Sequence, residues 1–141
     1  MKLSKNFSLE ELVHPDFINM LGDRAAHLIN PRLVDTCQAL RDQVQTGITI
    51  NDWHRGGNFK FSGLRPLDST VGAKRSMHKT GKAADLKFTG LTAEKVYYHI
   101  LNNQDKYPYI IRMESIDYTP SWIHIECDYD KRAGQIAIFN P

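Results

Sequence analysis

Apolar residues follow helical spacing early in this chain and strand-like runs late in it. The clearest helix starts at Asn30-Pro31, an N-cap followed by proline at the first helical position, and its apolar stripe continues until Gly47. The segments 109–114 and 122–127 are rich in β-branched and aromatic residues and are separated by a turn. This distribution predicts an α+β fold, with N-terminal helices packed on a small, mainly antiparallel sheet.

Weaker signals predict the remaining elements. The stretch 55–72 carries several glycines and is expected to be a long loop, and loops of this length are commonly functional. The other elements predicted are a capping-box helix from Ser8 to His14, a helical turn over 16–22, a helix capped by Thr92, and strands over 48–53, 83–88 and 136–139.

Composition excludes several classes of protein. With 141 residues, of which 41% are hydrophobic, the chain is long enough for one domain over residues 1–141 with its own core. A net charge of +2 is far from the basic excess of nucleic-acid-binding domains, so nucleic acid is not expected as a partner. Cys37 and Cys127 show no metal-binding or disulfide pattern, which indicates two buried thiols.

Targeting signals are also missing from the sequence. The start lacks the apolar stretch of a secretory signal, and no run approaches the length of a membrane span. We therefore expect synthesis in the cytoplasm without a signal peptide, no membrane partner, and a monomer.

Alternation along two predicted strands leaves polar side chains off the apolar faces. In the segment 122–127, His124 and Glu126 fall on the face opposite the three apolar residues. In the segment 83–88, Asp85 projects away from the apolar positions. These side chains are candidates for a polar site built on the sheet.

The strand predicted over 109–114 adds a further acid. Alternation places Glu114 on the same face as Ile110 and Arg112, and places Met113 on the opposite face. Glu114 is therefore expected beside the polar face of the neighbouring strand.

Three short motifs occur in a fixed order along the chain. Residues 62–65 fit S-x-x-R, residues 76–85 fit S-x-H-x-x-G-x-A-x-D at every fixed position, and residues 122–126 fit W-x-H-x-[DE]. In this combination the chain resembles the M15-type zinc D-Ala-D-Ala peptidases and phage endolysin peptidases, with hedgehog-type domains as distant relatives. The opening segment 7–12 is similar to the helix start of phage members, so the resemblance covers nearly the whole chain.

The resemblance implies a zinc site. In such proteins the positions of His78, Asp85 and His124 ligate one Zn²⁺ and leave a fourth position for water. Three protein ligands and an open position are typical of catalytic rather than structural zinc. Imidazole and carboxylate also suit iron, cobalt or nickel, so the choice of zinc rests on the resemblance.

A metallopeptidase also needs a carboxylate that takes a proton from water and later passes it to the leaving amine. Many relatives carry this acid three residues before the last histidine, where the present chain has Ser121. Glu114 is the first candidate for the role, because its strand neighbours the strand of His124. Asp117 is the second candidate and Glu126 the third.

The resemblance further implies that Arg65 stabilises a substrate carboxylate or the oxyanion, since a guanidinium can donate two parallel hydrogen bonds. Basic residues surround the proposed site and are either a solvated cluster or a surface that attracts peptide carboxylates or anionic polymers. They are Lys74, Arg75, Lys79, Lys82 and Lys87.

These observations predict a zinc-dependent hydrolase that cuts a peptide bond in the stem peptide or cross-bridge of peptidoglycan, as a carboxypeptidase or an endopeptidase of bacterial or phage type. Without a signal, such an enzyme would reach the cell wall after release or delivery. The alternative is a non-catalytic, zinc-stabilised module that binds cell-wall or other anionic ligands.

Overall fold

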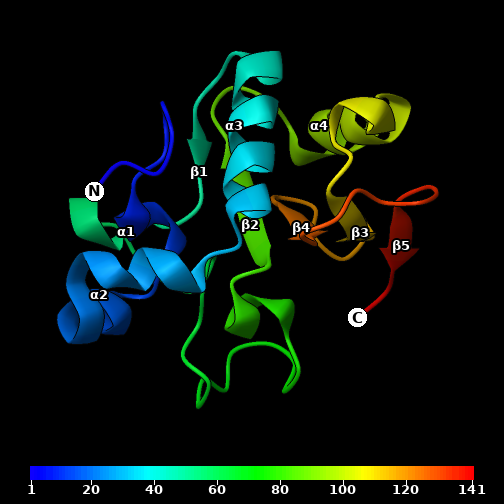
Figure 1. Cartoon of the computed structure of the whole chain (residues 1–141). Helices are drawn as coiled ribbons and strands as arrows, with labels where there is room; N and C mark the ends of the chain where they lie inside the picture. Colours follow the sequence, from blue (N-terminus) through cyan, green and yellow to red (C-terminus); the bar gives the residue numbers. More distant parts are fainter.

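The helix predicted after Asn30 lies against the middle of a five-stranded sheet as α3 (Pro31–Val44) in the computed structural model, which describes all 141 residues (Figure 1). The Asn30 side chain accepts a hydrogen bond from the Arg32 amide at 2.9 Å, as expected of an N-cap. The helix stops earlier than the predicted Gly47, because Gln45 adopts the left-handed conformation with φ of 54°.

The sheet has the strand order β1-β2-β4-β3-β5. All neighbouring strands are antiparallel except β3 and β5, which are parallel, so the prediction of a mainly antiparallel sheet in an α+β fold is confirmed. The strands are β1 (Ile48–Thr49), β2 (Ala83–Phe88), β3 (Ile110–Glu114), β4 (Ile123–Cys127) and β5 (Ala137–Phe139).

The remaining helices are short and follow the predicted starts. Figure 1 shows α1 and α2 beyond the β1 edge of the sheet, whereas the C-terminal strand β5 forms the opposite edge. The Thr92 side chain caps α4, as predicted, by accepting a hydrogen bond from the Lys95 amide at 3.2 Å. The helices are α1 (Leu9–Leu12), α2 (Pro15–Leu21) and α4 (Ala93–Asn102), with 3-10 turns at Gly22–Leu28, Trp53–Arg55, Met77–Thr80 and Gln104–Lys106.

The strand predicted over 48–53 is wrong beyond its first two residues. The Asn51 amide donates to the Glu11 carbonyl at 3.0 Å, and the Asn51 side chain donates to the Val13 carbonyl at 3.2 Å. These bonds tie the chain to α1 and its exit, so it leaves the sheet. Trp53 then begins a 3-10 turn.

Simple alternation also fails in β3. Ile110 and Met113 are both fully buried, whereas Arg112 is exposed. The register against β4 shifts between Ile110 and Arg112, and this irregularity moves Ile110 to the core side. Glu114 still faces the polar side, as the alternation predicted.

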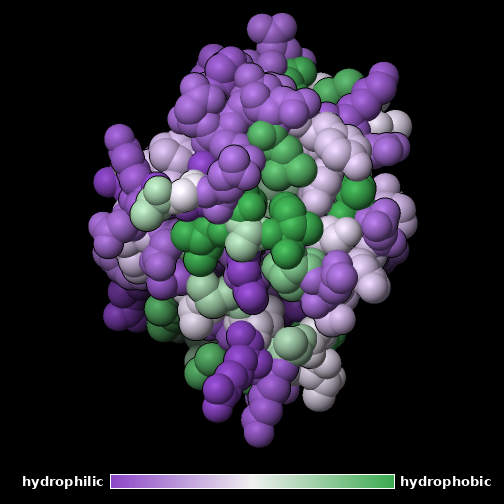
Figure 2. All heavy atoms as spheres, turned by 90° about the vertical axis from the view of Figure 1, so that its right-hand side faces the viewer, coloured by the Kyte–Doolittle hydropathy of each residue, from purple (hydrophilic) through white to green (hydrophobic).

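The core lies between the sheet and the helices, where 26 buried apolar residues form one cluster. Cys37 and Cys127 both belong to it, and burial raises the pKa of both thiols, that of Cys127 to about 12. Figure 2 shows the face toward β5, where apolar residues gather within a hydrophilic surround. None of the helices combines the length and the apolar character needed to traverse a bilayer.

Candidate metal centre

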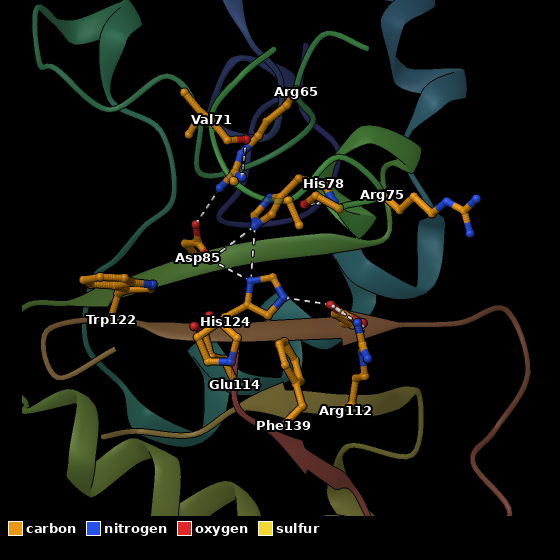
Figure 3. Close-up of a pocket in the computed structure, with 15 residues that line it drawn as sticks. Arg65, Val71, Arg75, His78, Asp85, Arg112, Glu114, Trp122, His124 and Phe139 are labelled. Carbon is orange, nitrogen blue, oxygen red and sulfur yellow. Dashed lines mark hydrogen bonds and ion pairs between the residues drawn. The ribbon is translucent and has the colours of Figure 1, made fainter. Parts of the chain in front are cut away.

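Three side chains predicted as ligands point their polar atoms at one spot above the sheet (Figure 3). The Nε2 atom of His78 lies 3.3 Å from Oδ1 of Asp85 and 3.2 Å from Nδ1 of His124. The third side of the triangle, from His124 Nδ1 to Asp85 Oδ1, measures 2.9 Å. The structure therefore brings together three residues from distant parts of the sequence.

The sheet itself places two of the three. Asp85 in β2 is the register partner of His124 in β4, so their side chains leave the same face side by side. The flanking Ala84 and Ile125 pair on the opposite face and are fully buried in the core. The alternation that fills the core thus also presents the acid and the imidazole together.

His78 lies in a 3-10 turn whose N-cap is Ser76 and whose C-cap is Gly81, both residues of the motif over 76–85. The Ser76 side chain caps the turn by accepting a hydrogen bond from the His78 amide at 3.3 Å. Gly81 ends it with φ of +69°, and a Cβ there would stand 2.0 Å from the Leu28 carbonyl oxygen. The serine and the glycine of the motif are therefore needed for the backbone that presents the imidazole.

The S-x-x-R segment runs directly behind the centre. The Gly63 carbonyl accepts a hydrogen bond from Nδ1 of His78 at 2.9 Å, and the Ser62 carbonyl accepts one from the Asp85 amide at 2.8 Å. A Cβ on Gly63 would lie 2.2 Å from the Leu12 carbonyl oxygen. Only glycine therefore lets this segment pass between α1 and His78.

His124 is held from behind by a carboxylate. Nε2 of His124 donates to Oε1 of Glu126 at 3.0 Å, and the buried Glu126 is bound in turn by the guanidinium of Arg112 through two hydrogen bonds. Carboxylates and backbone carbonyls are the usual partners of metal-binding imidazoles, because they fix the tautomer and the orientation of the ring. His78 and His124 each have such a partner, so each ring directs its free nitrogen toward the centre.

Asp85 is held in the same way by a cation. Oδ2 of Asp85 accepts a hydrogen bond from Nη2 of Arg65 at 3.1 Å, which leaves Oδ1 facing the two imidazoles. Burial opposes ionisation of this acid, but hydrogen bonds to His124 and His78 hold the pKa of Asp85 well below its usual range. The Asp85 carboxylate is therefore charged at any physiological pH.

The two imidazoles differ in their proton affinity. Burial lowers the pKa of His78, so this ring is neutral at pH 7. Burial alone would also lower the pKa of His124, but its hydrogen bonds to Asp85 and Glu126 outweigh burial and raise the pKa to about 9. In the metal-free protein His124 is consequently a cation between two carboxylates.

The donor set and its spacing fit a divalent metal. Tetrahedral Zn²⁺ with bonds of about 2.0–2.1 Å holds its ligand atoms about 3.3 Å from one another. The three observed separations are 2.9, 3.2 and 3.3 Å, so the ligand atoms need only small movements to accept an ion. A His78-Asp85-His124 group of this kind can hold a metal ion.

A cavity of about 280 Å³ opens at the candidate metal centre. The ligands line it together with Glu114, Trp122, Arg75 and Phe139 (Figure 3). The Glu114 carboxylate makes no hydrogen bond or ion pair within the chain, and burial, with Asp85 and Glu126 nearby, raises its pKa against the opposing effect of His124 and Arg65. Glu114 is therefore a free acid that faces the same cavity as the ligands.

The other candidate acids lie differently. Asp117 is exposed and borders a separate hollow with Glu94, so the structure does not bring it to the centre. Glu126 borders the cavity, but both of its oxygens are engaged by His124 and Arg112. Of the three acids suggested by the sequence, only Glu114 is both near the ligands and free.

Sequence reasoning missed the partners behind the ligands. The sequence predicts Arg112 only as a neighbour of Glu114, and it predicts Glu126 beside His124 on the polar face and as a possible proton carrier, but not as a partner of Arg112. The useful signal was the spacing of two residues between His124 and Glu126, which puts both on one face of β4. Nothing in the sequence indicates that the Gly63 carbonyl contacts His78.

Comparisons with protein-family models, with curated proteins and with solved structures found no match to this chain. The resemblance to the M15-type peptidases is therefore carried by the motif residues alone, and what it implies about activity enters below as a proposal.

Proposed function

We propose that this protein is a zinc-dependent peptidase that hydrolyses a peptide bond in the stem peptide or cross-bridge of peptidoglycan. The observation that supports catalysis is the position of Glu114, a free carboxylate that faces the same cavity as the three candidate ligands. The substrate class rests on the resemblance of the three motifs to peptidoglycan-directed enzymes.

The candidate ligands would be His78, Asp85 and His124. A bound zinc ion at this position would supply Lewis acidity, which polarises a carbonyl and lowers the pKa of water. The backbone carbonyl of Gly63, the carboxylate of Glu126 and the guanidinium of Arg65 keep the three ligand atoms directed at the ion. This support reduces the rearrangement needed on binding.

Glu114 would carry the proton. Its raised pKa brings the carboxyl closer to neutral pH, where a group can both accept a proton from water and return it to the leaving amine. Its lack of any partner in the chain leaves both oxygens available to a substrate or to water. Ser121, where many relatives carry their acid, is exposed and is not part of this cavity.

Arg65 has a narrower role than the resemblance implies. Its guanidinium already donates to Asp85, to the Val71 carbonyl at 3.3 Å and to the Phe61 carbonyl. It also borders the cavity, and each terminal nitrogen keeps one further N–H. We therefore propose that Arg65 positions Asp85 first and stabilises the oxyanion with the remaining donors.

The test is hydrolysis of purified peptidoglycan and of a D-Ala-D-Ala-terminated peptide by the zinc-loaded protein, measured by release of new amino groups. We expect turnover that is abolished by a chelator, restored by zinc, and absent in His78→Ala. The matched control is His27→Ala, an exposed histidine outside the site, which should retain full activity.

Absence of turnover on both substrates by a fully zinc-loaded wild-type protein would contradict the peptidase proposal. Stoichiometric zinc together with binding to peptidoglycan, but no cleavage, would instead support the zinc-stabilised binding module.

A further inference from the structure

A second hollow adjoins the candidate metal centre. It measures about 530 Å³ and shares Asp85 and Trp122 with the cavity that contains Glu114. Figure 3 shows Trp122 beside Asp85, on the side of the centre away from Arg112. A peptide that crosses from one hollow to the other would pass over Asp85, one of the three candidate ligands.

Lys87 is the one cationic side chain that lines this second hollow, and Asp85 is its one carboxylate. Lys87 projects from β2 two residues after Asp85, and its Nζ donates to the Ser62 hydroxyl at 2.8 Å and to the Asp85 carbonyl at 3.3 Å. Its ammonium also lies 4.2 Å from the ring centroid of Phe59. These contacts fix the ammonium at the wall of the hollow.

Lys87 has no acidic partner of its own. No carboxylate lies within ion-pair distance of Nζ, and the side-chain oxygens of Asp85 are directed to Arg65 and the two imidazoles. An ammonium has three N–H groups, of which two are used. One N–H donor and a partly buried charge without an ion-pair partner therefore remain beside the hollow, and a bound anion would offset the cost of burying this charge.

We propose that this second hollow is a substrate subsite in which Lys87 binds a carboxylate of the peptide. The inference rests on the proposed peptidase function, and it adds a requirement for a free carboxylate close to the bond that is cut. Two groups of a stem peptide supply that chemistry, namely the C-terminal carboxylate and the α-carboxylate of a γ-linked D-glutamate.

Neutralisation of Asp85 is a weaker explanation of Lys87. Asp85 already pairs with Arg65 at 3.1 Å, whereas Lys87 contacts only its backbone carbonyl. A lysine needed for packing alone would need only the apolar stem of its side chain and not its charge. A Lys87→Met variant keeps that stem and removes only the charge, so it separates the two roles.

The experiment measures peptide binding by calorimetry to zinc-loaded Glu114→Gln protein, which keeps the ligands but lacks the free acid. The first pair of probes is diacetyl-L-Lys-D-Ala-D-Ala and its C-terminal amide. The second pair is L-Ala-γ-D-Glu-L-Lys and the same peptide with D-isoglutamine in place of D-glutamate. Each pair is compared with Lys87 present and with Lys87→Met.

We expect the carboxylate member of one pair to bind about tenfold or more tightly than its amide, and this preference to fall below about twofold in Lys87→Met. The pair that shows the effect identifies the carboxylate. Lys60→Met is the matched control, because Lys60 also lies over a phenylalanine ring, at 5.5 Å from Phe61, but does not border either hollow.

An equal carboxylate preference with and without Lys87, or no preference in either pair, would overturn the subsite. This outcome is independent of turnover, because binding is measured in a variant that does not need to catalyse. If the wild-type protein does not cleave either substrate but the carboxylate preference still depends on Lys87, the peptidase proposal is refuted. The subsite would then be part of a binding module.

Discussion

The side chains on the two sides of the candidate metal centre differ in how they are held. Behind the centre, each ligand has a fixed partner: the Gly63 carbonyl for His78, Arg65 for Asp85 and Glu126 for His124. Facing the cavities, Glu114 has no polar partner and Lys87 has an unused donor.

This difference indicates a division of function between the side chains behind the centre and those that face the cavities. Side chains that hold an ion benefit from partners that fix their orientation, because a side chain that is already ordered loses less conformational entropy when the metal binds. Groups that transfer a proton or bind a substrate need a hydrogen-bond donor or acceptor that is not already used within the protein. Variants on the cavity side should therefore change turnover or peptide binding, and variants behind the centre should change metal affinity. Arg65 belongs to both groups, because it holds Asp85 and also borders the cavity, so its variants should change both.

The sharpest test of this division is Glu114→Gln. The amide keeps the shape of the side chain but cannot accept a proton, so we expect kcat to fall by about 10²–10⁴-fold, as for the loss of a general acid–base group. Zinc affinity should stay the same within error, because Glu114 is not a candidate ligand. Peptide hydrolysis and zinc titration on the same preparation measure both quantities.

Asp117→Asn is the matched control for that variant. Asp117 is an exposed acid in a separate hollow, so both turnover and zinc affinity should be unchanged. If Asp117→Asn lost turnover and Glu114→Gln kept it, the assignment of the proton carrier from cavity geometry would be wrong.

The reverse pattern is expected for Glu126→Ala. This change removes the acceptor that orients His124 and leaves its Nε2 unpartnered, so zinc affinity should fall by about 10–100-fold. Turnover per bound zinc should change much less. Competition with a chromogenic chelator measures the affinity, and Glu126→Gln should recover most of it because the amide oxygen still accepts a hydrogen bond.

Much of this arrangement could be predicted from sequence because it depends on local pattern. The N-cap of α3 is set by Asn30 within one turn, and the alternation of β4 puts His124 and Glu126 on one face whatever the rest of the chain does. The motif from Ser76 to Asp85 contains two of the three candidate ligands, which the resemblance implied, and its serine and glycine shape the turn that carries His78.

What sequence could not predict depends on contacts between distant segments. The strand that begins at Ile48 ends after two residues because Asn51 bonds to the α1 region, nearly forty positions away in the chain. The irregular pairing of β3 moves Ile110 into the core. The Arg112 partner of Glu126 likewise appears only when β3 and β4 are paired.

The carboxylates that hold His124 in place also predict how metal binding depends on pH. In the metal-free protein the pKa of His124 is about 9, so at pH 7 its Nδ1 carries a proton that an ion must displace. Apparent zinc affinity should therefore rise about tenfold per pH unit from neutrality and level off above about pH 9. The pKa of His78 is lowered, so this ring adds no second proton.

Calorimetry in buffers of different ionisation enthalpy checks that prediction, with about one proton released per zinc at pH 7. Release of two protons would mean that a second group, either His78 or water bound to the zinc, also loses a proton on binding. Release of none would mean that His124 is neutral there, and that its contacts to Asp85 and Glu126 do not stabilise the imidazolium.

The smallest effect is expected one step further behind the centre, at Arg112. Its guanidinium binds Glu126 and lies 4.2 Å from the ring centroid of Phe139, but 45% of the side chain is exposed. Solvent screening limits such a pair to about 1 kcal/mol or less, so Arg112→Met should weaken zinc binding by no more than about fivefold. Arg24→Met, an exposed change away from the centre, should have no effect on zinc affinity. A loss for Arg112→Met as large as that for Glu126→Ala would show that the arginine, rather than the buried carboxylate, fixes the orientation of His124.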